Sequence, residues 1–234
     1  MTDSTGTNEE FPAPETPPLP AVLTKDHLIT TKELEAKVQV LGKRGSLIEA
    51  VDGPGLGASE KDQFRGLRIE NVGDLLKQIE TKLNGSQLGV LELWGHAWYG
   101  GFRLATPEKE RDASKTLEAN YLDARNAAWV GERLSRLPWS ENGVIVLNGC
   151  NVGNQIKDSW VQTFADKSQR TVYAALGNSM GWTVVQSKAE IRNWGWRKKG
   201  KDELKGWYKE LLQPEGPGVC GGQNELWRVF IPKR

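Results

Sequence analysis

Two mainly apolar runs in the middle of the chain each end at a residue that can carry chemistry. Val144 to Leu147 precede Gly149 and Cys150, and Val90 to Trp94 precede Gly95 and His96. Short runs of aliphatic and β-branched residues predict strands that are covered on both faces, as parallel strands are. A thiol and an imidazole are therefore expected just past the carboxyl ends of two buried strands.

Helical and alternating patterns fill the rest of the chain. Apolar residues at helical spacing predict amphipathic helices over Asn71 to Leu83, Leu122 to Leu137 and about Lys157 to Asp166, with Pro138 ending the second. A shorter helical turn is expected over residues 31 to 36. Apolar and alternating runs predict further strands at Lys37 to Leu41, Ser46 to Val51, Thr171 to Leu176 and Glu225 to Ile231, and a hairpin at Trp98 to Leu104.

Strand and helix alternate through the middle of the chain, which predicts an α/β protein with a mostly parallel sheet flanked by helices. The 54 residues from His96 to Cys150 include a helical segment, as a strand, crossover helix and strand unit requires. If the two strands are neighbours, both tips open at the carboxyl edge of the sheet, where α/β proteins bind ligands. His96 and Cys150 would then share one cleft.

A strand that ends in His with Gly beside it, followed about 50 residues later by a strand that ends in Gly-Cys, is the order found in caspases. In WGHAWYGG and LNGCNVG, the chain resembles the caspase-like superfamily of cysteine peptidases, which also holds gingipain, legumain, separase and several bacterial groups. The resemblance covers roughly residues 36 to 185. Ala97 stands where the family usually has Gly, and LNGCNVG looks more like the bacterial members.

The resemblance implies a caspase-like three-layer sandwich with a dyad of Cys150 and His96 at adjoining strand tips. It further implies oxyanion and cleft positions at Gly95, Ala97 and Gly149, and substrate contacts from Asn178, Ser179 and Trp182. Asn148 and Asn151 either orient this site or simply form its turn. The expected activity is that of an endopeptidase acting on a protein or peptide substrate without a cofactor.

Composition predicts a single folded domain over residues 24–234. Residues 1–23 contain five prolines and four acids without Lys or Arg, which is typical of a disordered leader. Residues 187–209 carry eight basic residues, three acids and three tryptophans. This segment is interpreted as a solvated insertion, which either draws acidic polypeptides toward Cys150 or is a solubilising loop remote from the cleft. Single-stranded nucleic acid is a less favoured partner, because no nucleic-acid module surrounds the segment.

The net charge and the cysteine content indicate which partners, compartment and cross-links are expected for this protein. The 31 basic and 30 acidic residues give a net charge of +1, which favours neither nucleic acid nor membrane as a partner. The two cysteines, Cys150 and Cys220, are too few for a disulfide scaffold, and the polar start and lack of a long apolar run predict a cytoplasmic protein. No metal is expected, since no ligand spacing joins His27, His96, Cys150 and Cys220.

Ten tryptophans leave a second functional class open. Tryptophans in this number are typical of a packed core with an aromatic rim, but they are also found in clefts that bind peptides or glycans. A non-catalytic α/β binding module with such a cleft is therefore the alternative to a peptidase.

Overall fold

The computed structural model describes residues 27–52, 66–98, 100–104, 114–154, 159–176 and 226–233. Their centre is a seven-stranded sheet with the order β1-β10-β9-β8-β4-β2-β3. Strands β3, β2, β4, β8 and β9 run parallel, whereas β10 is antiparallel to β9 and β1 is antiparallel to β10. The strands are β1 (Leu28–Thr30), β2 (Ser46–Asp52), β3 (Leu67–Ile69), β4 (Leu88–Trp94), β8 (Trp139–Asn148), β9 (Thr171–Ala175) and β10 (Leu226–Phe230).

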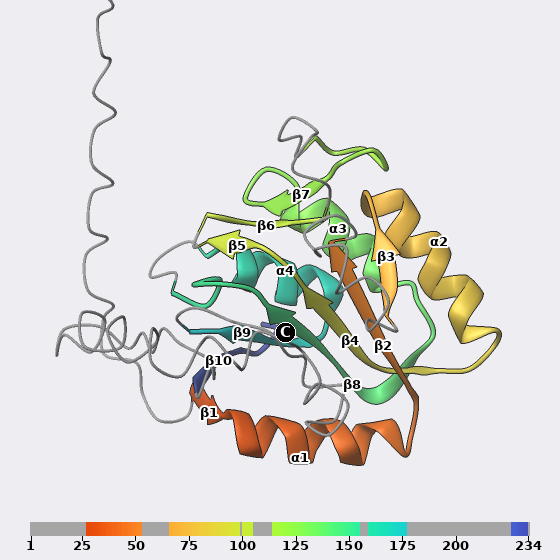
Figure 1. Ribbon diagram of the computed structural model, residues 1–234, viewed down its shortest axis with the longest axis vertical. Helices are drawn as coiled ribbons and strands as arrows, with labels where there is room; N and C mark the ends of the chain where they lie inside the picture. The colour runs from red at the N-terminus through yellow and green to blue at the C-terminus, as the bar shows by residue number, and fades with distance from the viewer. Residues whose placement is uncertain are drawn as a thin grey trace, which may run out of the picture.

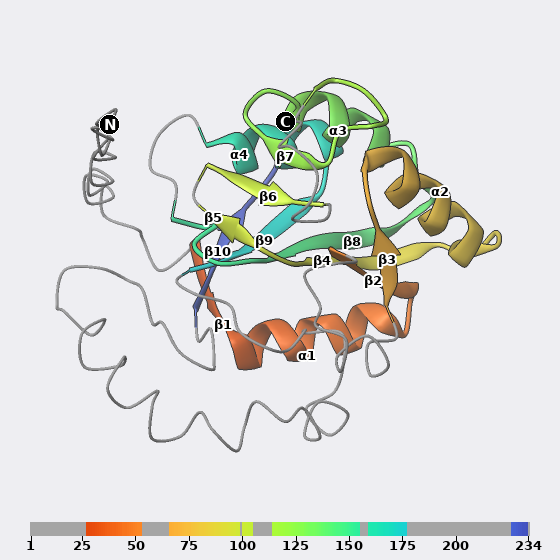
Figure 2. The same ribbon diagram turned by 45° about the horizontal axis from the view of Figure 1, so that its top comes forward.

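Helices cover both faces of this sheet, which confirms the predicted α/β class. Helix α1 lies beneath the sheet in Figure 2, and α2, α3 and α4 lie above it. A small antiparallel sheet, β5-β6-β7, lies on the same side as α3 and α4 (Figures 1 and 2). These elements are α1 (Thr31–Gly42), α2 (Val72–Leu83), α3 (Ala127–Leu134), α4 (Trp160–Ser168), β5 (Ala97–Trp98), β6 (Gly101–Arg103) and β7 (Tyr121–Asp123).

The central strands β4 and β8 form the core of the sheet. The side chains from Val144 to Asn148 and from Leu88 to Leu93 are buried, as strands covered by helices on both faces must be. Figure 1 shows the arrowheads of β4 and β8 side by side, so the two strands predicted to carry His96 and Cys150 are neighbours and parallel.

The predicted strand over Lys37 to Leu41 is wrong, because this segment is the second half of α1. Val38 and Val40 alternate with polar residues, but Leu34, Val38 and Leu41 also share one helical face, and these three are buried. Val40 is 52% exposed on the other side. The helix extends well beyond the short turn expected from residues 31 to 36.

The predicted helix over Leu122 to Leu137 begins too early, because Tyr121–Asp123 pair with β6 as strand β7. Asn126 ends this strand: its Oδ1 accepts from the Asp123 N–H at 3.0 Å, and its Nδ2 donates to the Tyr121 carbonyl at 2.7 Å. Helix α3 therefore starts only at Ala127. Its expected inward residues Ala127, Val130 and Leu134 are buried. Leu137, also expected inward, is buried but lies beyond the helix, which ends at Leu134.

Other predicted elements are confirmed with small shifts in their ends. Helix α2 begins after Asn71, whose side chain accepts from the Asp74 N–H, and ends at Asn84 in the left-handed region. The strands at residues 46–51, 171–176 and 225–231, the helix near 157–166 and the hairpin after His96 are all present. Strands β1 and β3 were not predicted. The leader 1–23 and the segment 187–209 lie outside the described residues.

Acid should weaken the start of α1. The pKa of Glu33 lies below its ordinary value of 4.5 because the side chain and the backbone N–H of Thr30 donate to its carboxylate, in a capping box. A lowered pKa stabilises the fold fully above about pH 4.5, and this contribution is lost as the pH falls through the folded-state value. Urea unfolding at pH 7 and pH 3 should show a larger loss for the parent than for Glu33→Gln, which keeps an acceptor but does not titrate. Equal losses would contradict this role.

Candidate active site

The tips of β4 and β8 lie in register at one edge of the sheet. Trp94 at the end of β4 is paired with Asn148 at the end of β8. His96 and Cys150 each follow this pair by two residues. The Gly95 N–H donates to the Asn148 carbonyl at 3.3 Å, so hydrogen bonding between the two segments continues past the end of β4. The main chain therefore brings both candidate residues to the same level of the same sheet edge.

The residues next to His96 and Cys150 are in direct contact. A Cβ placed on Gly149 would lie 2.5 Å from Ala97 Cβ, 2.8 Å from Phe102 Cε2 and 3.0 Å from the Gly95 carbonyl oxygen. Such distances leave no room for a side chain, so only glycine allows this approach. The two residues that flank His96 thus touch the residue that precedes Cys150.

The candidate side chains differ in exposure. Cys150 is half-buried, whereas His96 is exposed. The His96 carbonyl accepts from the Arg103 N–H at 2.9 Å, which joins the chain after β4 to the β5-β6 hairpin. A thiol and an imidazole at this edge are both within reach of a molecule from solvent.

The loop that carries Cys150 is held by strands on its far side. The Gly153 N–H donates to the Ala175 carbonyl of β9 at 2.8 Å, and Arg228 Nη1 of β10 donates to the Gly153 carbonyl at 3.4 Å. Burial lowers the pKa of Arg228, because desolvation disfavours the charged guanidinium. Asn151 turns the loop with a φ of 58°, as a turn-forming asparagine does.

Asn148 has a different role from Asn151, because its side chain is buried within the sheet. Its Nδ2 donates to Glu92 Oε1 on β4 at 2.7 Å. Glu92 is 0% exposed and Asn148 is 1% exposed. Sequence reasoning missed Glu92, although one acid inside the otherwise apolar run from Leu88 to Trp94 was a usable signal.

The remaining predicted site residues divide into two groups. Gly95, Ala97 and Gly149 meet at the strand tips, through the contacts described above. Asn178, Ser179 and Trp182, which were expected to contact substrate, lie outside the described residues, as does Cys220. The described part of the site therefore consists of the two strand tips and the loop after β8.

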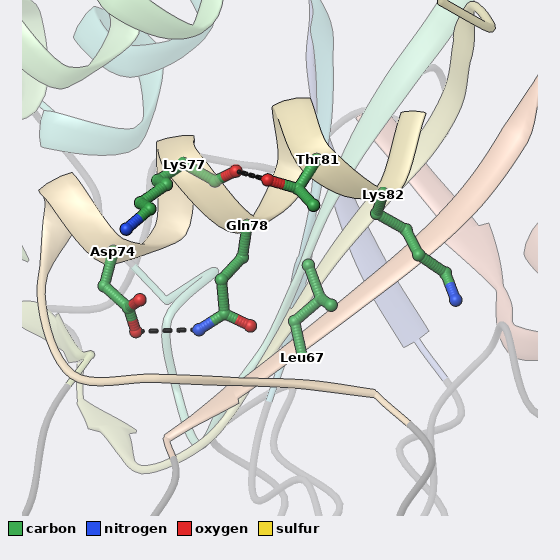
Figure 3. Close-up of a pocket in the computed structure, with 6 residues that line it drawn as sticks. All are labelled: Leu67, Asp74, Lys77, Gln78, Thr81 and Lys82. Carbon is green, nitrogen blue, oxygen red and sulfur yellow. Dashed lines mark hydrogen bonds between the residues drawn. The ribbon is translucent and has the colours of Figure 1, made fainter. Parts of the chain in front are cut away.

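A hollow of about 430 Å³ lies elsewhere, between β3 and α2 (Figure 3). The Asp74 carboxylate beside it accepts from Gln78 Nε2 at 2.8 Å and from the Glu70 N–H at 3.1 Å, and Gln78 also donates to the Arg68 carbonyl. These bonds fix the first turns of α2 against β3. The residues lining this hollow do not include the strand tips: they are Leu67, Asp74, Lys77, Gln78, Thr81 and Lys82.

Two structural features are absent from the described ranges. Their His, Cys, Asp and Glu residues form no group of three or more that is placed to hold a metal ion. None of their helices combines the length and the apolar character needed to cross a membrane.

A comparison of the chain with protein-family models, with curated proteins and with solved structures finds no match in any of the three. The described residues define a mixed α/β protein with a mostly parallel sheet and flanking helices.

Changing Gly149 to Ala should destabilise the protein by about 1–3 kcal/mol, the usual cost of overpacking. The new methyl group would collide with Ala97 Cβ and with Phe102. Ala97→Gly alone should cost about 0.5–1 kcal/mol in a strand, but it should recover part of the loss when combined with Gly149→Ala. Denaturant unfolding of the parent, both single variants and the double variant measures this coupling. Gly149→Ala with parental stability would contradict the close approach.

Proposed function

We propose that this protein is a caspase-like cysteine endopeptidase in which Cys150 is the nucleophile and His96 is its acid–base partner. One observation carries the proposal: the parallel strands β4 and β8 are neighbours, and each candidate residue follows the Trp94–Asn148 pair by two positions. The resemblance of the two motifs to caspase-like peptidases supports the same assignment. The substrate is a protein or peptide, and the mechanism needs no cofactor.

The chemistry begins with a proton transfer from the Cys150 thiol to His96, since the thiolate is the reactive form. The sulfur attacks the substrate carbonyl carbon, and the resulting tetrahedral intermediate collapses with loss of the amine. The imidazolium of His96 gives its proton to that amine, which leaves the acyl group on Cys150 as a thioester. Water then attacks the thioester with His96 as base, releasing the carboxylic acid and restoring the thiol.

The surrounding backbone suits this reaction. Gly149 has no side chain, and it brings the main chain of the Cys150 segment against Gly95 and Ala97. In the proposal, backbone N–H groups at this turn stabilise the negative charge on the carbonyl oxygen during attack. The Gly153 N–H donates to the Ala175 carbonyl and the Gly153 carbonyl accepts from Arg228, and these two bonds hold the end of the loop against β9 and β10.

Iodoacetamide should label Cys150 faster than Cys220 at neutral pH, because an adjacent imidazole favours the thiolate. His96→Ala should remove this difference, whereas His27→Ala, which changes the other histidine of the chain, should keep it. Peptide mass spectrometry after timed labelling gives both rates in one sample. Equal labelling of the two thiols in the parent would count against the dyad.

A diverse peptide library should be cleaved by the parent but not by Cys150→Ala. Cys220→Ser should retain the parental pattern, which shows that loss of a thiol elsewhere has no effect. Mass spectrometry of the products identifies the cleaved bonds.

One observation favours the alternative function, a binding module without catalysis. Trp98 and Tyr121 form an edge-to-face pair 5.7 Å apart on the small sheet that follows His96, and both are half-buried. Tyr and Trp are enriched at binding interfaces, where the apolar ring packs and the polar atom finds a hydrogen-bond partner. Binding of library peptides without cleavage, with equal affinity for the parent and for Cys150→Ala, would support this function and contradict the peptidase.

A further inference from the structure

A buried polar pair lies at the strand tips, because Asn148 is the last residue of β8 and Glu92 precedes the end of β4 by two residues. Asn148 Nδ2 donates to Glu92 Oε1 at 2.7 Å, and both side chains are shielded from solvent. Burying a carboxyl group and an amide costs free energy, and a hydrogen bond between them only offsets that cost. Apolar side chains of similar size would fill the same space without this cost in free energy. Their neighbours along the strands, Val90, Leu91, Val146 and Leu147 among them, are all apolar.

Asn148 is joined to β4 in two ways. Its side chain binds Glu92, and its carbonyl accepts from the Gly95 N–H at 3.3 Å. Apolar contacts tolerate small shifts between strands, whereas a hydrogen bond is directional and favours one position. The β4–β8 register does shift between Leu88 and Val90, but it is continuous from Val90 to Trp94. The double link thus lies at the end of the pairing that carries His96 and Cys150.

We propose that Glu92 is a positioning residue, which acts through Asn148 to hold the Cys150 loop against the His96 segment. Asn148 precedes Cys150 by two residues, and Gly95 is the residue before His96. Fixing Asn148 on β4 therefore fixes both segments relative to each other. The catalytic role of Cys150 and His96 in this inference rests on the proposed function. The placement of the two segments by Glu92 and Asn148 does not, because it needs no substrate.

Disulfide formation tests this placement without any peptidase activity. The reference chain carries His96→Cys and Cys220→Ser. In this chain, oxidised glutathione should join the introduced thiol to Cys150 in a disulfide. The two thiols lose two protons and two electrons, and the oxidant is reduced to two glutathione thiols. The bond requires Cα atoms about 4.4–6.8 Å apart, so its rate depends on how the strand tips lie. Non-reducing mass spectrometry follows the product. A reference chain in which no such bond forms would overturn the proposal.

Exchange of the two polar groups gives a matched set of variants. Adding Asn148→Asp to the reference chain brings two carboxyl groups together, and it should slow disulfide formation about tenfold. Adding Glu92→Gln to that variant recreates a hydrogen bond of opposite direction with almost the same atoms, and it should restore the rate. An unchanged rate with Asn148→Asp, or failure of the exchanged pair to restore it, would overturn the proposal.

A variant with two apolar residues at these positions distinguishes a positioning role of Glu92 from a role in stability alone. The same variant tests the proposal if Asn148→Asp does not fold. Glu92→Met with Asn148→Leu removes both partners of this hydrogen bond, and denaturant unfolding measures how far the stability of the variant differs from that of the reference chain. Disulfide formation should nevertheless be about tenfold slower than in the reference chain, because the directional hydrogen bond is missing. A rate of disulfide formation equal to that of the reference chain would overturn the proposal. Failure of the parent chain to cleave peptides would instead remove the proposed function and leave these rates unaffected.

Discussion

The parallel pairing of β4 with β8 is the interaction on which the candidate site depends. These two strands are covered by helices on both faces, and their side chains form the middle of the core. Because both strands run the same way, their carboxyl ends meet at one edge, and the segments that carry His96 and Cys150 leave the sheet side by side. The close approach of Gly149 to Ala97 adds a second constraint. It lets the two departing segments stay in contact beyond the last paired residues.

The pattern of apolar residues predicted the secondary structure correctly where only one periodicity, helical or alternating, fits the residues. Helix α2 has a cap, a single apolar face and an Asn-Gly end, and its limits agree with the prediction within one residue. The pattern failed where two periods fit the same residues. In Lys37 to Leu41, the alternation of Val38 and Val40 resembles a strand, and only the burial of Leu34, Val38 and Leu41 shows the helix. Strand β3 is three residues long, which is too short for a periodic signal.

The candidate site was predictable as a pair of strand ends but not as a set of contacts. His96 and Cys150 each follow a recognisable apolar run, so their position in the sheet could be inferred from the sequence. The contact of Gly149 with Ala97 depends on how far each strand extends before the chain turns, and no local pattern encodes that distance. The Glu92–Asn148 bond joins residues 56 positions apart, and such a pairing becomes visible only when the strand register is known.

The order of the strands also constrains how the chain can reach this structure. Strand β1 has β10 as its neighbour in the sheet, and Leu28 is paired with Arg228 across about 200 residues. During synthesis, β1 must wait for β10 before its hydrogen bonds can form, and contacts between such distant residues slow folding. The same late strand supplies the Arg228 side chain that binds the Gly153 carbonyl. The loop around the candidate nucleophile therefore gains the Arg228 hydrogen bond only after β10 has been made, so in the proposed peptidase the nucleophile would be positioned late in folding.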